Sequence, residues 1–381
     1  MNTPNSEPLI EQLLANIRQD DIPASKAVQY VDQVLSTFRR ISLIGQDDTY
    51  VIRVLESIGE SYEALGSLIK ATEILQEALD LVSRLQDRAS EGTLRWKLGR
   101  VYRKRNLWDE AITQVQESRK IHETLENQTG QAQCWNSEGL IYFSQGNYAN
   151  AEEAYHFAIQ QSEAIGDQRI ASGASMNLGI LANIRGDFGR ALLLYQNSLT
   201  VYEQSDSREA MARAYHNIGI CYSAQSNWPA ALDAFEKSLD IALTAGHLIL
   251  SAVNYIEKAS VFLELNDTSV AATYCAQAID ICKEVDYPLG VAEAYRVLGK
   301  MYTAKGDYST AHSLLTESLN LCDQYNDPLA HAETRRQIGI LHISTNETEQ
   351  ARNTLETARQ EFETLGAQHD AQITQNLIDT V

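Results

Sequence analysis

Small and apolar residues recur along this chain with a period of 40 residues. One small column is glycine in every copy but one, at Gly59, Gly99, Gly139, Gly179, Gly219, Ala259, Gly299 and Gly339. A second column, twelve residues further on, is always alanine: Ala71, Ala111, Ala151, Ala191, Ala231, Ala271, Ala311 and Ala351. A fixed period of this length without insertions predicts stacked repeats, in which each unit buries its apolar face against the next.

Turn-forming residues divide each period into two predicted helices. Before the glycine, most units have a residue that can accept from the free N–H groups of a helix start, as at Asp47, Asp87, Asn127, Asp167, Ser207 and Asp327. Seven residues after the glycine, each unit has a residue type that tolerates the left-handed conformation ending a helix: Gly66, Asn106, Gly146, Gly186, Ser226, Asn266, Gly306 and Asn346. We therefore expect a helix A that carries the glycine and a helix B that carries the alanine.

Two antiparallel helices with these columns resemble the tetratricopeptide repeat. The family's order of aromatic, Leu-Gly, Tyr, Ala, aromatic and small residue is followed by Tyr215, Ile218, Gly219, Tyr222, Ala231, Phe235 and Ser238. The common repeat has about 34 residues, and the longer version is similar to LGN-type scaffolds, Rap-type peptide-sensing regulators and the sensor parts of some bacterial transcription activators. The resemblance implies an all-α, right-handed superhelical α-solenoid of eight helix-turn-helix repeats with helical caps at both ends.

The period predicts three regions. An N-terminal helical cap covers residues 1–46, with a degenerate helical pair at 8–19 and 23–40, and a C-terminal capping helix covers 367–381. The repeats lie between them, at 47–86, 87–126, 127–166, 167–206, 207–246, 247–286, 287–326 and 327–366. Both caps are expected to cover apolar faces of the end repeats rather than to form separate effector domains.

The composition excludes several classes of partner. Apolar residues make up 44% of the 381 residues, and the net charge is -20, which opposes non-specific binding to nucleic acid or to anionic membranes. No stretch approaches the length of a membrane span, and the first residues lack the pattern of a signal peptide. The five cysteines fall at apolar positions and are expected to be reduced core residues. We expect a cytoplasmic protein without membrane insertion.

The resemblance also places the candidate binding residues. Counted so that the glycine is position 8 of helix A, positions 2, 5, 6, 9, 12 and 13 line the concave groove of tetratricopeptide arrays. Here the middle of that stripe is apolar with amides, and basic residues stand on either side. The candidates for a peptide-binding groove are Trp96, Arg100, Arg103, Asn136, Leu140, Phe143, Met176, Asn177, Ile180, Asn183, Arg213, His216, Asn217, Ile220, Ile256, Arg296, Lys300 and Arg336.

Two interpretations of these residues stay open. Apolar side chains on a wet surface indicate a partner, although tight curvature could cover them without a ligand. Asn177 and Asn217 share position 6 in consecutive units, and their amides could hold a peptide backbone or bond to a neighbouring helix.

Basic residues are densest in the second repeat, at Arg95, Lys97, Arg100, Arg103, Lys104 and Arg105. This cluster could receive acidic residues of a ligand, and it could equally pair with Glu56, Glu60 and Glu63 one repeat earlier. Further along, Glu293 with Arg296 and Glu333 with Arg336 are spaced as ion pairs on a helix surface.

Sequence signals of catalysis are absent. The chain has no Gly-rich phosphate loop and no HExxH, CxxC or GxSxG sequence. His216 is the one histidine on the stripe, and we interpret it as a peptide contact or a solvated residue rather than a catalytic base. We expect no enzyme activity, no cofactor and no metal.

We therefore predict a scaffold or adaptor that binds a peptide segment of a partner protein in its concave groove. One alternative is a peptide-sensing regulator whose superhelix changes pitch on binding. Rap-type proteins carry an N-terminal helical bundle, whereas only about 45 residues precede the first repeat here, which disfavours that alternative. A second alternative is a scaffold that self-assembles, so an oligomer is possible.

Overall fold

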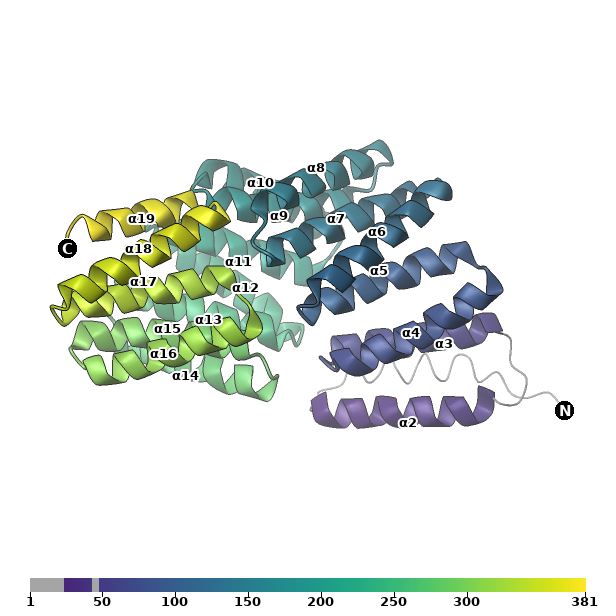
Figure 1. Ribbon diagram of the computed structural model, residues 1–381, viewed down its shortest axis with the longest axis horizontal. Coiled ribbons are helices and arrows are strands. Elements are labelled where there is room, and N and C mark those ends of the chain that lie inside the picture. The colour runs from purple at the N-terminus through teal and green to yellow at the C-terminus, as the bar shows by residue number, and fades with distance from the viewer. Residues whose placement is uncertain (1–23, 43–47) are drawn as a thin grey trace. The chain divides into compact units, whose positions relative to one another are not determined.

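Every regular element in the described part of the chain is an α-helix. The computed structural model describes residues 24–42 and 48–381 (Figure 1). The helices are α2 (Ala24–Ser42), α3 (Asp48–Ala64), α4 (Leu68–Leu85), α5 (Arg88–Lys104), α6 (Trp108–Thr124), α7 (Gln128–Ser144), α8 (Tyr148–Ala164), α9 (Gln168–Ile184), α10 (Phe188–Gln204), α11 (Arg208–Ala224), α12 (Trp228–Thr244), α13 (Leu248–Glu264), α14 (Thr268–Glu284), α15 (Pro288–Lys305), α16 (Tyr308–Tyr325), α17 (Pro328–Ser344), α18 (Thr348–Leu365) and α19 (Gln368–Ile378). The expected all-α solenoid of paired helices is confirmed, while the predicted helix at 8–19 lies outside the described residues.

The helices alternate regularly because equivalent residues begin and end them. The carboxylates of Asp87, Asp187 and Asp307 accept from backbone N–H groups that have no partner within their helices. All the predicted left-handed positions that follow helix A have a positive φ, from Gly66 to Asn346. The ends of helix B use the same conformation, at Gln86, Glu126, Gly166, Asp206, Gly246, Asp286, Asn326 and Gly366.

The repeated glycine lets helix B approach helix A closely. A Cβ atom added at Gly219 would lie 2.5 Å from Phe235 Cε1, and one added at Gly179 would lie 2.5 Å from Tyr195 Cε1. The closest neighbour is therefore the side chain sixteen residues after the glycine, and not the alanine column that the sequence emphasises. These side chains are Leu75, Val115, Tyr155, Tyr195, Phe235, Cys275, Leu315 and Leu355.

The one unit without the glycine confirms that space between the two helices is limited. It has Ala259 in the glycine column, and its partner sixteen residues later is Cys275, the smallest side chain of that column. Both residues are fully buried. A larger residue on helix A is thus matched by a smaller one on helix B, as close packing in a core requires.

Serine hydroxyls of helix B also bond to helix A. Ser238 Oγ donates to Ala212 O at 2.8 Å, and Ser318 Oγ donates to Ala292 O at 2.7 Å. Ser118 and Ser198 make the equivalent bond in their repeats. Because a buried hydroxyl without a partner costs about 1–3 kcal/mol, these bonds favour one register of the two helices.

The described helices form two compact units, a division that the period does not mark. The first comprises the described residues up to Ile141 together with Gln160–Gly166. The second comprises Tyr142–Ile159 and Asp167–Val381.

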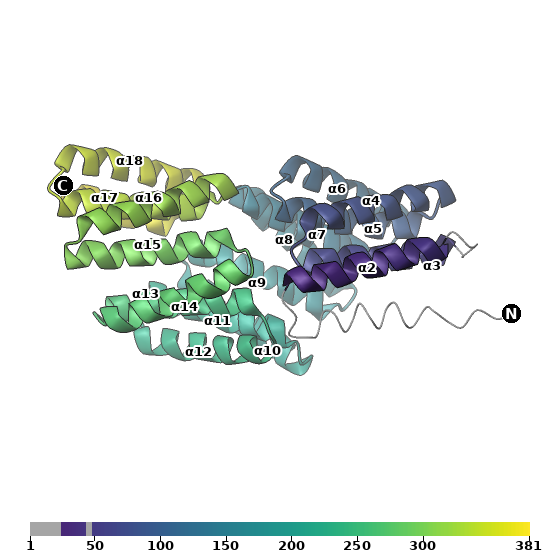
Figure 2. The same ribbon diagram turned by 90° about the horizontal axis from the view of Figure 1, so that it is seen from below.

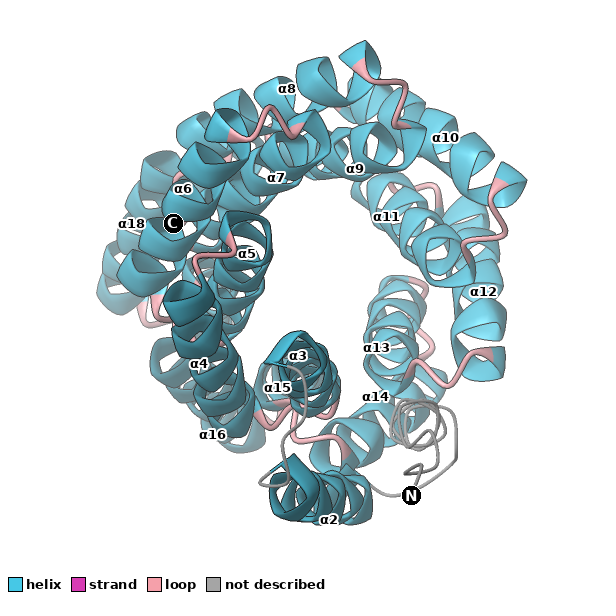
Figure 3. Cartoon of the chain, turned by 90° about the vertical axis from the view of Figure 1, so that its right-hand side faces the viewer, coloured by secondary structure: helices cyan, strands magenta, loops and turns pink. Residues whose placement is uncertain are grey.

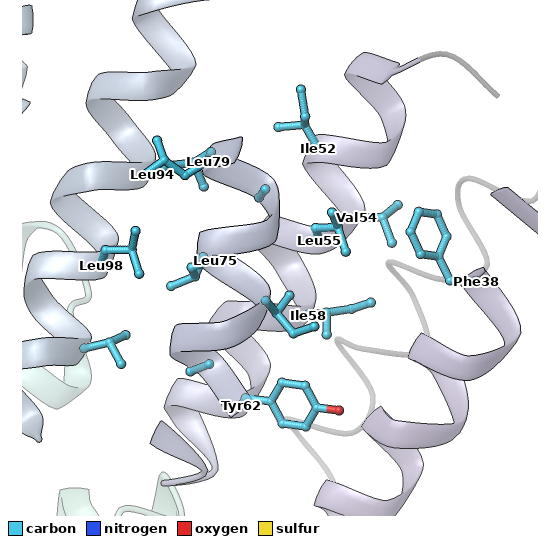
Figure 4. Packing of buried hydrophobic residues seen from close by; sticks show 14 of the residues in the cluster. Phe38, Ile52, Val54, Leu55, Ile58, Tyr62, Leu75, Leu79, Leu94 and Leu98 are labelled. Carbon is cyan, nitrogen blue, oxygen red and sulfur yellow. The ribbon is translucent and has the colours of Figure 1, made fainter. Parts of the chain in front are cut away.

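In the first unit, α2 covers the apolar face of the first helical pair. Phe38 of α2 packs in one core with Leu55 and Ile58 of α3, Leu75 of α4 and Leu98 of α5 (Figure 4). All five side chains are almost completely buried. Among the described residues, α2 thus buries apolar surface at this end of the repeats, as a cap would.

In the second unit, the core passes from each helical pair to the next. Tyr195 of α10 packs in one cluster with Cys221 of α11, and Leu315 of α16 packs with Leu341 of α17. Figure 2 shows the successive pairs α15–α16 and α17–α18 stacked in this way.

Replacing Gly219 with alanine should destabilise the second unit by about 1–3 kcal/mol, because the new Cβ would overlap the Phe235 ring. Gly173→Ala is the matched control, since Gly173 also lies in a helix A but its nearest neighbour is Tyr202 Oη at 4.0 Å. That variant should gain about 0.5–1 kcal/mol from helix propensity. Urea unfolding measures both variants, and equal stabilities would contradict the close approach described for Gly219.

Candidate functional site

In the second unit, the A helices form the inner layer of a curved row of helical pairs. Helices α9, α11, α13, α15 and α17 contact one another in sequence, whereas successive B helices of this fully described unit have no contact of comparable extent. In a curved row, helices on the inner side lie closer to one another than helices on the outer side, so the A helices are the inner layer. Figure 3 shows α9, α11 and α13 inside α10, α12 and α14. We call the surface of these A helices that points away from the B helices the inner face.

The candidates of the first unit take part in contacts within the fold. Trp96 Nε1 donates to Ser137 Oγ at 2.8 Å, and the Arg100 guanidinium lies 4.9 Å from the centre of the Trp96 ring. The other candidates of this unit are half-buried: Arg103, Asn136 and Leu140.

Three members of the basic cluster, Lys97, Arg100 and Lys104, pair with the preceding helix A, α3. Lys97 Nζ lies 2.6 Å from Glu56 and 2.5 Å from Glu60, and Arg100 Nη2 lies 2.5 Å from Glu63. Burial acts to raise the pKa of Glu63, but the hydrogen bond and charge of Arg100 hold that pKa below its usual value. The sequence left open whether this cluster binds a ligand or pairs within the fold, and the structure shows pairing within the fold. A ligand carboxylate would have to displace these glutamates.

Two residues expected to face solvent belong to the core instead. Met176 is 7% exposed and Ile256 is 1% exposed. Each packs with the next helix A, Met176 with Ile218 of α11 and Ile256 with Val297 of α15. The expectation of exposure is wrong for these two because contact between successive A helices covers position 5.

The apolar candidates that remain on the inner face are Ile180 and Ile220. Both are half-buried, as is Phe143 at the end of α7, so each keeps part of its surface in contact with solvent. The Phe143 ring stacks on Tyr148 with 5.2 Å between ring centres. The apolar part of the inner face is therefore smaller than the sequence suggests, and it is centred on α9 and α11.

Polar atoms without partners lie at equivalent places on α9 and α11. Asn183 Oδ1 and Ser223 Oγ, both at position 12 of helix A, are shielded from solvent and accept or donate no hydrogen bond among the described residues. Asn217 is half-buried and also has no partner there, whereas Asn177, half-buried at the same position of α9, does interact within the fold. Because buried polar groups are normally paired, this part of the inner face has hydrogen-bonding capacity that the fold leaves unused.

A chain of hydrogen bonds fixes His216, which follows Arg213 on α11. His216 Nδ1 lies 3.1 Å from Asn254 Oδ1, Asn254 Nδ2 donates to Ser238 Oγ at 2.8 Å, and that hydroxyl donates to helix A as described above. Since the amide oxygen can only accept, Nδ1 carries the proton and Nε2 is an acceptor. Burial lowers the pKa of His216 to about 4, so the ring is neutral at physiological pH.

Asn254 is a partner of the candidate His216 that the sequence reasoning missed. It is fully buried at position 3 of α13. Equivalent positions in the other repeats hold Val54, Leu94, Cys134, Ala174, Ala214, Ala294 and Thr334. The sequence signal that could have found Asn254 is an amide in a column of mostly apolar residues, because a buried amide requires polar partners.

Carboxylates gather on the inner face of α13, α15 and α17. Arg296 Nη2 lies 3.4 Å from Glu293 on its own helix and 2.9 Å from Glu333 on α17. Burial, together with the nearby charge of Glu293, raises the pKa of Glu257 to about 8. Burial also raises the pKa of Glu293 to about 7, although Arg296 opposes the shift. Arg296 carries one positive charge and cannot neutralise the three carboxylates of Glu257, Glu293 and Glu333. Bound protons therefore remove part of their negative charge.

The remaining basic candidates also have acidic partners. Arg336 Nη1 lies 2.7 Å from Asp370 of α19, and the expected pair of Arg336 with Glu333 is replaced because Glu333 binds Arg296. Arg213 pairs with a glutamate on its own helix, and Lys300 pairs with one at the end of α13.

Helical pairs that repeat every 40 residues define a helical-repeat protein. Family models described as tetratricopeptide repeat match residues 50–124, 169–244 and 250–324, and a further one matches residues 132–160. The chain belongs to the tetratricopeptide repeat family.

One curated relative is named as an activator, and one similar structure is named as a regulator. The transcriptional activator NprA of Geobacillus stearothermophilus is 25% identical over 190 residues, which are 47% of this chain and 46% of that protein. The chain spans less than half the length of the curated relatives it matches. A Rap protein complexed with Competence and Sporulation Factor has a TM-score of 0.67 at 12% identity, covering 95% of this chain and 99% of that one. The Rap conjugation gene regulator of plasmid pLS20 with the Phr* peptide has a TM-score of 0.60 at 13% identity, covering 96% and 99%.

None of the described helices has the length and apolar character needed to cross a membrane. Over the same part of the chain, His, Cys, Asp and Glu side chains form no group that could hold a metal ion.

The carboxylate cluster should make stability depend on pH. Glu257 keeps its proton to a pKa of about 8 in the folded state, against 4.5 normally, so folding binds protons and stability should fall as pH rises through this window. Glu257→Gln cannot ionise and should flatten the decline of the melting temperature with pH. The lowered pKa of His216 makes stability rise with pH in the more acidic range, which is the opposite dependence. The contribution of Glu257 is therefore measured as the difference between the variant and the wild type.

Glu317→Gln is the matched control for this experiment, since Glu317 is an exposed carboxylate on the outer helix α16. It should leave the pH profile of the melting temperature parallel to that of the wild type. A profile for Glu257→Gln that is also parallel to the wild type would show that Glu257 ionises normally in the fold.

Proposed function

We propose that this chain is a peptide-binding regulatory or adaptor protein, and that it takes an extended segment of a partner on the inner face of its second unit. The observation that carries the proposal is the unused hydrogen-bonding capacity of α9 and α11. Asn183 Oδ1 and Ser223 Oγ have no partner among the described residues, and the half-buried apolar surface of Ile180 and Ile220 lies on the same helices. A peptide offers both a polar backbone and apolar side chains.

Each group has a distinct part in the proposed complex. The amides of Asn177 and Asn217 bind the ligand backbone, since an amide has both a donor and an acceptor. Ile180 and Ile220 contact apolar side chains of the ligand. His216, with Nδ1 committed to Asn254, accepts through Nε2 from an N–H or O–H group.

The charged residues have a smaller part than the sequence suggests. Arg296, Lys300 and Arg336 of the second unit each have an acidic partner in the fold. An acidic residue of the ligand therefore binds by exchanging with one of these carboxylates, so we assign most of the affinity to backbone and apolar contacts.

The similar proteins favour the regulatory form of this proposal over a passive scaffold. Both Rap structures are complexes, one with Competence and Sporulation Factor and one with the Phr* peptide, and the NprA relative is named as a transcriptional activator. The Rap chain with Competence and Sporulation Factor aligns over 95% of this chain, so the short N-terminal region no longer argues against a peptide-sensing regulator. Such a regulator would change the pitch of its helical array on binding.

A displayed library of random linear peptides tests the proposal with no partner chosen in advance. The wild type should enrich a sequence family, and the triple variant Asn177→Ala, Asn217→Ala, Ile180→Glu should bind its best member at least about 100-fold more weakly, as loss of several contacts implies. Leu193→Glu is the matched control, because Leu193 is 58% exposed on the outer helix α10. Titration calorimetry gives the affinities.

Equal affinity of the triple variant and the wild type, with the helical content of both unchanged, would overturn the proposed site. Light scattering over a dilution series distinguishes a self-assembling scaffold from a peptide-binding protein. Growth of the particle with concentration in the absence of peptide would favour a self-assembling scaffold.

A further inference from the structure

The C-terminal end of the second unit packs against loops of the third and fourth repeats. In a simple solenoid each repeat contacts only its neighbours. Here α19 contacts α9, and Figure 1 shows the yellow α19 beside the teal α10. The segment responsible is Leu365–Asp370, where α18 ends and α19 begins.

The first contact involves the loop between α7 and α8. A Cβ atom added at Gly146 would lie 2.4 Å from Leu365 Cδ2 and 3.6 Å from Pro328 Cγ. Leu365 is 8% exposed, so it is a buried side chain although it stands at the end of its helix. Tyr148, at the start of α8, is also buried.

The second contact involves the loop between α9 and α10. A Cβ atom added at Gly186 would lie 3.1 Å from His369 Cβ. The His369 ring meets the Phe188 ring edge-on, with 5.1 Å between centres and 86° between planes. One residue further on, Asp370 pairs with Arg336 of α17, which anchors the same segment to its own end of the unit.

These contacts are specific to two members of a column that is present in every repeat. Gly66 and Gly306 occupy the same column with the same left-handed conformation, and nothing lies within 4 Å of the Cβ that a side chain would add there. Asparagine or serine fills the column elsewhere, at Asn106, Ser226, Asn266 and Asn346. A side chain is therefore compatible with the turn itself, and Gly146 and Gly186 leave room for the C-terminal segment.

We propose that Leu365–Asp370 is an intramolecular latch, which docks on the helix A–helix B loops at Gly146 and Gly186 and holds the second unit closed. Released, the A helices α9 to α17 could change their curvature, because the ends of the row would no longer be tied together. If the inner face binds a peptide, the latch sets the shape of that face; this last step alone rests on the proposed function.

Spin labels on the two sides of the latch test it in the absence of any ligand. Gly189→Cys places a label on α10 where a Cβ meets nothing within 4 Å, and Gln372→Cys places one on the exposed side of α19. The native cysteines are all buried, which allows selective labelling. Pulsed electron paramagnetic resonance should give one short, narrow distance distribution in this background.

Gly146→Asn with Gly186→Asn should lengthen and broaden that distribution, because both new side chains occupy the space of the latch. Gly66→Asn with Gly306→Asn is the matched control and should leave it unchanged, since it makes the same substitutions in the same column away from the latch. Identical distributions in the two double variants would overturn the latch. That result would leave the peptide proposal standing, because no peptide is present in the measurement.

A variant with a shortened side chain tests the latch even if the glycine variants fail to fold. His369→Ala removes the contact with Phe188 without adding atoms, and hydrogen exchange of the α19 amides should then be at least about ten-fold faster than in wild type, as loss of an aromatic contact implies. His156→Ala, at an exposed position on α8, should leave this exchange unchanged. Equal exchange of α19 in both variants would count against the latch.

Discussion

The structure depends on the close approach of helix B to helix A at the repeated glycine. The large side chain sixteen residues later occupies the space over that glycine, as Phe235 does over Gly219. This contact sets the distance within each pair, and the buried serine bonds favour one register. Because each pair has nearly the same geometry, the stacking of pairs repeats and curvature accumulates. In the second unit the A helices then become the inner layer, which is the reason that the candidate residues of α9 and α11 share one face.

Much of the fold could be predicted from the sequence because it follows from local rules. Glycine and alanine columns fix helix pairing, and residues such as Gly66 and Asn106 end helix A in the expected conformation. The left-handed ends of helix B were not predictable, since Gln86 and Glu126 rarely adopt that conformation. The division into two units and the docking of Leu365 at Gly146 are long-range facts, which a 40-residue period does not encode.

The candidate site was less predictable, because it depends on contacts between repeats. Met176 lies on the stripe by spacing, but curvature brings the next helix A over it. Arg296 looked like half of a helix-surface pair, whereas it bridges two helices and leaves Glu257 to keep a proton. Asn254 was visible as an amide in an apolar column, but its role required the position of His216 on the neighbouring helix. Columns that agree between repeats thus specify the fold, and columns that differ specify what the inner face can bind.

The central claim is that the inner face of the second unit binds a peptide, and hydrogen–deuterium exchange with and without the tightest library peptide tests it most directly. Added protection is expected in α9, α11 and α13, with Asn183, Asn217 and Ile220 in the protected segments. Protection confined to the outer helices α10, α12 and α14, or to the first unit, would contradict the claim.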